Sequence, residues 1–431
     1  MFVFPPLETN DGRITDGQAV RNHNASLLTN LVWHHRQGIS RTDLARLSGL
    51  AVSTVSTIVN DLLALDLVAT DHMAPSRAGR PPAVLRFNDT RDHIVGVEMG
   101  ASHVTVALCD LRANVAWHQS HDFDVPGDPP GTMRLIGQLI DQARRHPSAS
   151  GSLLGVGVAV PCPVDSITPG RLSPRILPKW AEVHFAAELN HRTGARAFMD
   201  NDANCGALAE AFIGSGRGIS DFTYIKVATG VGAGHSVAGA PYRGFSGIAG
   251  EIGHTRVDPH GRRCRCGLNG CLETEVGSQS IVDKAIAALG AGRESALASV
   301  KPLGLEAIVA AARAGDPLAV ELIAEAGGHL GVAIANLINL MNPARVVLGG
   351  RLATAGELLL APLRKSLLER ALWTSIERSD VVISALGSEH IAVGGALLVL
   401  RAALADLGLF PEPRPAVTRL PKELPARTGT T

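Results

Sequence analysis

Apolar residues recur at the spacing of an α-helix in three short segments near the N-terminus, over 22–33, 41–47 and 53–63. Ser40 is placed to cap the second helix and Ser53 the third, because a hydroxyl at a helix start accepts a hydrogen bond from a free backbone N–H. A glycine between these two helices allows a sharp turn. The pattern predicts a helix-turn-helix, a unit whose second helix can enter the major groove of DNA.

Two short apolar strands are expected directly after these helices, over 67–69 and 83–87, with a loop rich in Pro, Gly and Arg between them. A hairpin at this place is typical of the wing of a winged helix-turn-helix, which touches the phosphate backbone or the minor groove. The candidate DNA contacts are hydroxyls at the start of the third helix and arginines of the wing: Ser53, Thr54, Ser56, Thr57, Arg77 and Arg80.

Strand and helix patterns alternate over the longer region that follows a change in composition at 88–92. An apolar strand, a glycine-bearing turn and a second apolar strand occur twice, over 94–108 and 224–237. A further strand at 345–350 follows a long helix at 318–341. The repetition predicts an α/β fold of two related lobes, with a ligand bound between them at the strand ends.

These patterns divide the 431 residues into four segments. We expect loosely ordered ends at 1–18 and 411–431, a DNA-binding domain at 19–88 and a larger domain at 92–408. The first ten residues lack the basic and apolar segments of a signal peptide, and no run of about 18 apolar residues predicts a membrane span. These features favour a cytoplasmic protein without membrane contact.

Charge does not by itself indicate a nucleic-acid partner. The formal net charge is zero, and residues 1–90 hold eight Arg and no Lys against eight Asp and Glu. The case for DNA therefore has to rest on the local arrangement of the helices and the wing. The alternative for this region is a three-helix packing module that does not contact DNA.

Three of the six cysteines lie close together at Cys264, Cys266 and Cys271, shortly after His254. One imidazole and three thiolates form a complete tetrahedral ligand set, and soft thiolates favour zinc over hard cations. We therefore predict a structural Zn²⁺ site that orders its loop and leaves no open position for a catalytic water. The other three cysteines are isolated in apolar surroundings and are expected to be small core residues: Cys109, Cys162 and Cys205.

Carboxylate and amide side chains gather within 200–204, where an apolar strand pattern ends and a helix pattern begins. At a strand end such groups can hydrogen-bond sugar hydroxyls, and one carboxylate can act as general base on a hydroxyl that attacks a phosphoryl group. For Asp200 we favour the simpler role of capping the helix.

The segments SRTDLARLSGLAVSTVSTIVNDLLALDLV, GEIGH and CRCGLNGCLE closely resemble the ROK (repressor, open reading frame, kinase) family. The resemblance implies a winged helix-turn-helix joined to a two-lobed, actin-like sugar-kinase (ribonuclease H-like) domain. It also implies that the histidine of GEIGH both binds zinc and faces the sugar, and that Asp202 stands where the family's kinases hold their catalytic base. One visible departure is Asp66, in a turn that usually has glycine. The implied sugar contacts are Asn201, Asp202, Glu251, His254 and Glu273.

The two expected phosphate loops depart from those of the family's kinases, in which the first loop reads roughly Asp-x-Gly-Gly-Thr. Here Glu98 displaces the carboxylate that would manage magnesium, and the side chain of Ala101 crowds the approach of phosphate to the backbone. Ala228 replaces a glycine at the start of the second loop. We therefore expect ATP and Mg²⁺ binding to be weak or absent and Asp202 to be a sugar ligand. Weak candidates for nucleotide contacts remain: Gly100, Thr229, Gly230, Gly232 and Gly350.

Together these patterns predict a DNA-binding transcriptional regulator, expected to be a repressor, that responds to a sugar or sugar derivative. It would bind operator DNA as a homodimer or homotetramer. The apolar helices at 318–340 and 391–407 could supply the contact between copies, although their more ordinary role is lobe packing. One alternative is an ATP-dependent sugar kinase with an accessory DNA-binding module, and another is a regulator that responds to a protein partner instead of a sugar.

Overall fold

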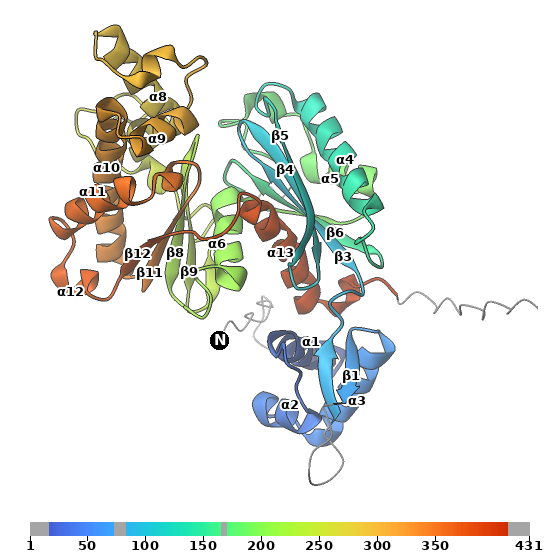
Figure 1. Cartoon of the computed structure of the whole chain (residues 1–431). Coiled ribbons are helices and arrows are strands. Elements are labelled where there is room, and N and C mark those ends of the chain that lie inside the picture. Colours follow the sequence, from blue (N-terminus) through green and yellow to red (C-terminus); the bar gives the residue numbers. More distant parts are fainter. Residues whose placement is uncertain (1–16, 73–82, 165–169, 413–431) are drawn as a thin grey trace, which may run out of the picture.

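The computed structural model of the chain describes residues 17–72, 83–164 and 170–412. Figure 1 shows a small N-terminal module, in blue, beneath the first of two larger lobes that lie side by side. The α/β fold with two lobes is confirmed.

The N-terminal module has the order of elements that the apolar pattern predicts, three helices followed by an antiparallel hairpin. The chain turns by 118° between the second and third helices, within the range of a helix-turn-helix. A bridge between Ile39 and Leu85 joins the segment before the second helix to the hairpin. The elements are α1 (Gly17–His34), α2 (Arg41–Ser48), α3 (Val52–Ala64), β1 (Val68–His72) and β2 (Ala83–Phe87).

Helix ends in the module follow the sequence prediction for α2 and depart from it for α3. Ser40 caps α2, and Gly49 ends it in the left-handed conformation with a φ of 70°. The prediction that Ser53 caps α3 is wrong, because Ala51 is the cap residue and no side chain accepts a hydrogen bond there. Asp66 has a φ of 55°, which glycine adopts most easily and Asp tolerates, so the turn keeps its shape without a glycine.

Each lobe is built on a five-stranded sheet, and the two sheets have the same connectivity. In each, three consecutive antiparallel strands are followed by two parallel strands added beside the first, which explains the repeated pattern in the sequence. The first sheet contains β3 (His93–Met99), β4 (His103–Asp110), β5 (Val115–Asp122), β6 (Leu153–Val160) and β7 (Ala197–Asn201). The second contains β8 (Phe222–Val227), β9 (Val231–Val237), β10 (Ala240–Tyr242), β11 (Arg345–Gly349) and β12 (Asp380–Ile383).

The helices of the lobes are α4 (Pro129–Arg145), α5 (Phe185–Thr193), α6 (Asp202–Ile213), α7 (Leu272–Val276), α8 (Ser278–Gly290), α9 (Leu305–Arg313), α10 (Pro317–Met341), α11 (Glu357–Leu368), α12 (Trp373–Ile376) and α13 (His390–Ala405). Helices α4 and α5 cover the outer side of the first sheet, and α8 to α12 form the outer part of the second lobe (Figure 1). Among the described residues, one helix, α10, is long and apolar enough to cross a membrane, and 61% of its most apolar window is buried in the lobe.

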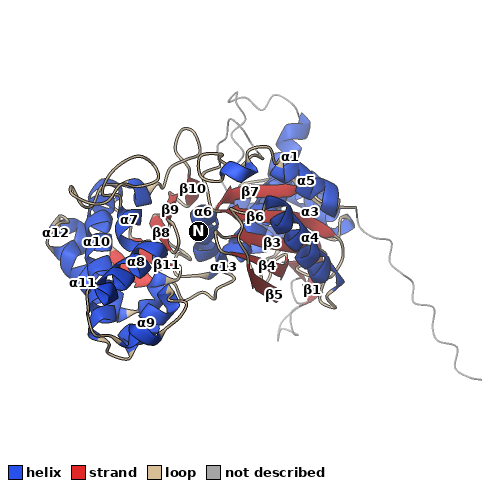
Figure 2. Cartoon of the chain, turned by 90° about the horizontal axis from the view of Figure 1, so that it is seen from above, coloured by secondary structure: helices blue, strands red, loops and turns tan. Residues whose placement is uncertain are grey.

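Two helices, α6 and α13, lie between the sheets and cross each other (Figures 1 and 2). Their backbones meet at Gly394, where a Cβ atom would lie only 2.0 Å from the carbonyl oxygen of Cys205. The hydroxyl of Tyr224 in β8 and Nε2 of His390 in α13 lie 2.8 Å apart, which adds a polar contact between the lobes. Because α13 is buried along most of its length, it serves lobe packing.

The module is docked onto the first lobe through α1. Nε1 of Trp33 donates a hydrogen bond to the carbonyl of Leu111 in the turn between β4 and β5, at 2.8 Å. On the same helix, Ser26 donates to the carbonyl of Ala405 at 2.9 Å, and Asn30 donates to that of Leu404 at 3.2 Å. The first helix of the module therefore rests on the C-terminal end of α13.

Candidate functional site

A cavity of about 170 Å³ lies between the lobes, where strands of both sheets end. Residues from the turns after β3, β6 and β8 and from the start of α6 contribute to its walls. The structure brings together in this cavity all five side chains that the family resemblance implies as sugar contacts: Asn201, Asp202, Glu251, His254 and Glu273.

Asn201 lies where β7 ends and α6 begins. Its Oδ1 accepts a hydrogen bond from the backbone N–H of Ala203 at 2.9 Å, so Asn201 is the helix cap. The prediction that Asp200 has this role is wrong. Asp200 is buried, accepts a hydrogen bond from Asn204 at 2.9 Å and forms an ion pair with Arg243. Asp200 therefore supports the start of α6 from behind while Asn201 faces the cavity.

Asp202 does not stand alone in the cavity, because a buried lysine lies against it. Nζ of Lys226, from β8, is 2.8 Å from Oδ2 of Asp202 and 3.0 Å from Oε1 of Glu98, which comes from β3 of the other lobe. His103 completes the group, with Nε2 3.5 Å from the same oxygen of Glu98. Sequence reasoning missed Lys226, because one lysine in an apolar strand carries no sign of partners 24 and 128 positions away.

Opposite charges decide how these buried groups ionise. Burial opposes the charge of Glu98, but the ammonium of Lys226 and the ring of His103 outweigh it and lower the pKa of Glu98 to about 2. Burial acts against the charge of Lys226 as well, and the carboxylates of Asp202 and Glu98 raise the pKa of Lys226 above its ordinary value. Glu98 and Lys226 are thus both charged at neutral pH.

Two more carboxylates face the cavity from the second lobe. Glu251 follows Gly250, whose φ is 104° and where a Cβ atom would lie 1.9 Å from the carbonyl oxygen of Ala233. Only glycine fits this close approach of the loop to β9. Burial raises the pKa of Glu251. Glu273, at the start of α7, accepts a hydrogen bond from the backbone N–H of Val231 at 3.2 Å, which fixes its carboxylate at the cavity wall.

His254, Cys264, Cys266 and Cys271 converge beside the cavity, with their ligand atoms all within 4.8 Å of one another. Sγ of Cys264 lies 3.7 Å from Nδ1 of His254, and Sγ of Cys266 lies 3.6 Å from that of Cys271. A tetrahedral ion with bonds of about 2.3 Å to sulfur holds its ligands about 3.8 Å apart, so this cluster can bind a metal ion.

The two nitrogens of His254 face different groups. Nδ1 points to the thiol of Cys264, and Nε2 lies 3.7 Å from Oε2 of Glu251 at the cavity. An ion held by the cluster would therefore fix the ring that the cavity presents to a ligand.

Four of the weak candidates for nucleotide contacts line two neighbouring cavities. Thr229, Gly230 and Gly232 belong to the walls of the cavity between the lobes. Gly350 instead lines a neighbouring cavity of about 460 Å³, and the ring of His103 lies over Gly100.

The hydroxyl side chains proposed for DNA contact lie on α3 but do not face one direction. Ser53 and Thr57 are exposed, whereas Thr54 and Ser56 are half-buried. Thr57 donates a hydrogen bond to the carbonyl of Ser53 at 3.1 Å, back along its own helix.

Arg41 is a further residue of this surface that sequence reasoning missed. From the first turn of α2 it donates hydrogen bonds to the carbonyl of Ser56 at 3.3 Å and to Oδ1 of Asn60 at 3.0 Å. Its guanidinium therefore lies across α3. The wing arginines Arg77 and Arg80 are outside the described residues.

Comparison with known proteins shows which family this chain is similar to. The sequence pattern of the ROK family matches residues 94–402. The chain is 28% identical to the xylose repressor of Caldicellulosiruptor bescii, covering 87% of this chain and 94% of that protein. It is 32% identical to the N-acetylglucosamine repressor of Escherichia coli O6:H1, covering 85% and 89%.

A solved structure extends this similarity to the fold of almost the entire chain. A ROK family transcriptional regulator described as a homologue of the Escherichia coli Mlc protein superposes with a TM-score of 0.77 at 29% identity. The superposition covers 90% of this chain and 98% of that one, so it takes in the N-terminal module as well as both lobes. On sequence and on fold, this chain belongs to the ROK family, among its transcriptional regulators.

Proposed function

We propose that the chain is a sugar-responsive transcriptional repressor, in which the N-terminal module acts as a winged helix-turn-helix on operator DNA and the cavity binds a sugar or sugar derivative. The observation that carries this proposal is that five polar side chains line one interlobe cavity and that one of them, His254, forms a cluster with three cysteines beside it. Amide and carboxylate groups on rigid strand ends suit the hydroxyl groups of a sugar. The names of the xylose and N-acetylglucosamine repressors point to the same class of ligand.

Zinc is the ion that suits the cluster, because three thiolates and one imidazole are soft ligands in tetrahedral number. With four protein ligands the ion would be structural, and its role would be to hold the loop that carries His254 and Glu251 against the cavity. The residues that would bind it are His254, Cys264, Cys266 and Cys271.

DNA recognition is assigned to α3, with Ser53 and Thr54 at its first turn and Arg41 beside it. A helix N-terminus favours phosphate, and its first side chains face base edges in the helix-turn-helix geometry. Operators of such modules contain two half-sites, so the working form is a homodimer or homotetramer in the cytoplasm.

A continuous set of contacts can carry a change from the cavity to the DNA-binding module. Helix α6 begins at the cavity with Asp202 and crosses α13 at Gly394, and the end of α13 contacts α1 through Asn30 and Ser26. A sugar that binds the open and closed lobes with different affinity shifts the position of α13 and so of the module. A coupling of about 1–3 kcal/mol changes DNA affinity about 5- to 150-fold.

The kinase alternative is less supported than the regulator. Phosphoryl transfer relies on metal ions held by carboxylates and on a free path between donor and acceptor. Here both Glu98 and Asp202 already bind the ammonium of Lys226. The resemblance of this chain also extends over its DNA-binding module to repressors.

The proposed function is tested by fluorescence anisotropy of the purified protein with DNA fragments from the promoter of its own operon. The titration is repeated with D-xylose, D-glucose, N-acetylglucosamine and their 6-phosphates where these exist, with and without ATP and magnesium. We expect specific, salt-sensitive binding that one sugar changes and that ATP does not. If every fragment showed the same negligible binding, the DNA-binding role would be refuted. If a bound transport protein changed DNA binding and no sugar did, the protein-partner alternative would be favoured.

A further inference from the structure

Lys226 lies at the partition between the two cavities of the cleft and lines both of them. Its side chain is 10% exposed, so its charge is almost entirely removed from water. The ammonium group contacts Glu98 on the first strand of one lobe and Asp202 at the start of α6, which packs on the sheet of the other lobe. One cation therefore joins both halves of the cleft.

We propose that Lys226 is a positioning residue that ties the two lobes together. Its ammonium group occupies the space between the carboxylates of Glu98 and Asp202, where a site for phosphoryl transfer would hold metal and phosphate. The lobe contact does not depend on which ligand the cavity binds. Its consequence for ligand binding, the fixed position of Asp202, rests on the proposed function.

The contact between the lobes is stable only when Lys226, Glu98 and Asp202 are all present. Removing two charges from water is costly, and the cost is offset only where opposite charges meet at hydrogen-bonding distance. Lys226 meets two carboxylates at 2.8 and 3.0 Å, and moving the lobes apart would separate Glu98 from it. The second cavity would then open to water beside a carboxylate that keeps only His103 as its partner.

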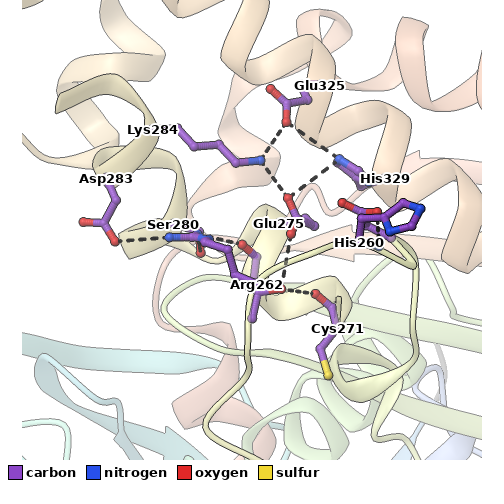
Figure 3. A network of polar contacts seen from close by, with 11 residues as sticks. His260, Arg262, Cys271, Glu275, Ser280, Asp283, Lys284, Glu325 and His329 are labelled. Carbon is purple, nitrogen blue, oxygen red and sulfur yellow. Dashed lines mark hydrogen bonds and ion pairs between the residues drawn. The ribbon is translucent and has the colours of Figure 1, made fainter. Parts of the chain in front are cut away.

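The chain contains a second lysine with the same chemistry but without the interlobe geometry. Nζ of Lys284, in α8, lies 2.8 Å from Oε2 of Glu275 and 2.7 Å from Oε1 of Glu325 (Figure 3). All three residues belong to the second lobe, on α7, α8 and α10. Lys284→Met therefore removes an equally bridged ammonium without touching the contact between lobes, and serves as the matched control.

The test measures the distance between the lobes in the full-length protein. Nitroxide labels are attached through unnatural amino acids at two exposed positions, His118 on β5 of the first lobe and Ala314 after α9 of the second. This labelling leaves all cysteines native. Double electron–electron resonance then gives the distance distribution in the absence of sugar, with labelled protein diluted into unlabelled protein to suppress contacts between copies. The variants are Lys226→Met, Lys226→Arg, Glu98→Gln and Lys284→Met.

We expect a longer and broader distance distribution for Lys226→Met and Glu98→Gln, a distribution like that of the unmodified chain for Lys226→Arg, and no change for Lys284→Met. If Lys226→Met does not fold, the double variant Glu98→Gln/Lys226→Met replaces it, because it leaves no carboxylate unpaired at β3. Distributions for Glu98→Gln and Lys226→Met that match the unmodified chain would overturn the tie. Calorimetry with the sugars named above is read separately: absent sugar binding by the unmodified chain would refute the proposed function and leave the lobe measurement intact.

Discussion

Trp33 of the N-terminal module donates a hydrogen bond from its indole nitrogen to the carbonyl of Leu111 in the first lobe, at 2.8 Å, with both residues buried. The guanidinium of Arg112 lies 5.7 Å from the centre of the same indole ring and donates to the carbonyl of Trp33. The module is thus joined to the lobe by directional contacts as well as by apolar packing, which fixes its orientation.

The Trp33 contact can be removed by Trp33→Phe. We expect the free energy of unfolding to fall by about 1–3 kcal/mol, because the carbonyl of Leu111 loses its donor, and the change in DNA affinity caused by sugar to become smaller. Trp180→Phe is the control, since Trp180 donates to the carbonyl of Val125 at 2.9 Å within the first lobe. Urea unfolding and anisotropy should show similar destabilisation in both variants and altered sugar response in Trp33→Phe alone. If sugar changed DNA affinity equally in the two variants, the contact of Trp33 with Leu111 would not carry the coupling between sugar and DNA binding.

Metal content can be measured directly. The unmodified chain is expected to hold about one zinc ion, and Cys271→Ser is expected to hold none, because three ligands bind zinc much more weakly than a closed tetrahedral set. Sugar affinity should fall with the metal, since the loop carrying His254 is no longer fixed. Cys109→Ala, which changes a buried cysteine far from the cluster, should keep its zinc. Full zinc content in Cys271→Ser by plasma mass spectrometry would contradict the ligand assignment.

Glu251→Gln tests the sugar contact of the GEIGH segment. We expect sugar affinity to fall about 10-fold or more, because a hydrogen-bonding site loses about 1–3 kcal/mol when one group no longer matches the ligand. Zinc content and thermal stability should stay unchanged, since Glu251 is not among the four clustered ligands. Glu294→Gln, at an exposed position of the second lobe, is the control. Calorimetry that finds the same affinity in both variants would remove Glu251 from the site.

Operator recognition by α3 is tested with Ser53→Ala and Thr54→Ala. Each change is expected to weaken binding to specific DNA by about 1–3 kcal/mol, the usual contribution of a base or phosphate contact at a recognition helix. Because Ala51 already caps the helix without a side-chain hydrogen bond, loss of the Ser53 hydroxyl should not destabilise α3. Ser148→Ala on the first lobe should leave DNA affinity intact. If both α3 variants bound DNA with unchanged affinity, recognition would be assigned to Arg41 and the wing instead of Ser53 and Thr54.

Two glycines inside helices should respond to alanine in opposite ways. At Gly394 a Cβ atom would meet the backbone of Cys205, so Gly394→Ala should destabilise the chain by about 1–3 kcal/mol through overpacking. At Gly328 in α10 nothing lies within 4 Å of the added atom, and Gly328→Ala should stabilise the helix by about 0.5–1 kcal/mol. Thermal unfolding of both variants measures the difference in stability. A destabilised Gly328→Ala would show that helix propensity does not determine the change in stability at this position.

The extent of sequence-based prediction follows from the range of each interaction. Helical spacing and strand repeats are local, and they predicted the module, both hairpins and the long helix α10 within a few residues. Ser40 was identified as a cap because its partner lies three residues away, whereas at α3 the backbone enters the helix one residue earlier and makes Ser53 an internal position. Lys226 and Arg243 have partners in other elements, and the pairing arises only when the lobes fold around α6.

The position of the crossing of α6 and α13 at Gly394 determines how far the C-terminal end of α13 moves when the helix rotates. From this point α13 continues for eleven residues to Ala405, a distance of about 16 Å at 1.5 Å per residue. A rotation of α13 by about 10° about this crossing would displace its end at Ala405 by roughly 3 Å. That displacement is comparable to a hydrogen-bond length, so a rotation of α13 about its crossing with α6 would be felt at the contacts of its C-terminal end with α1.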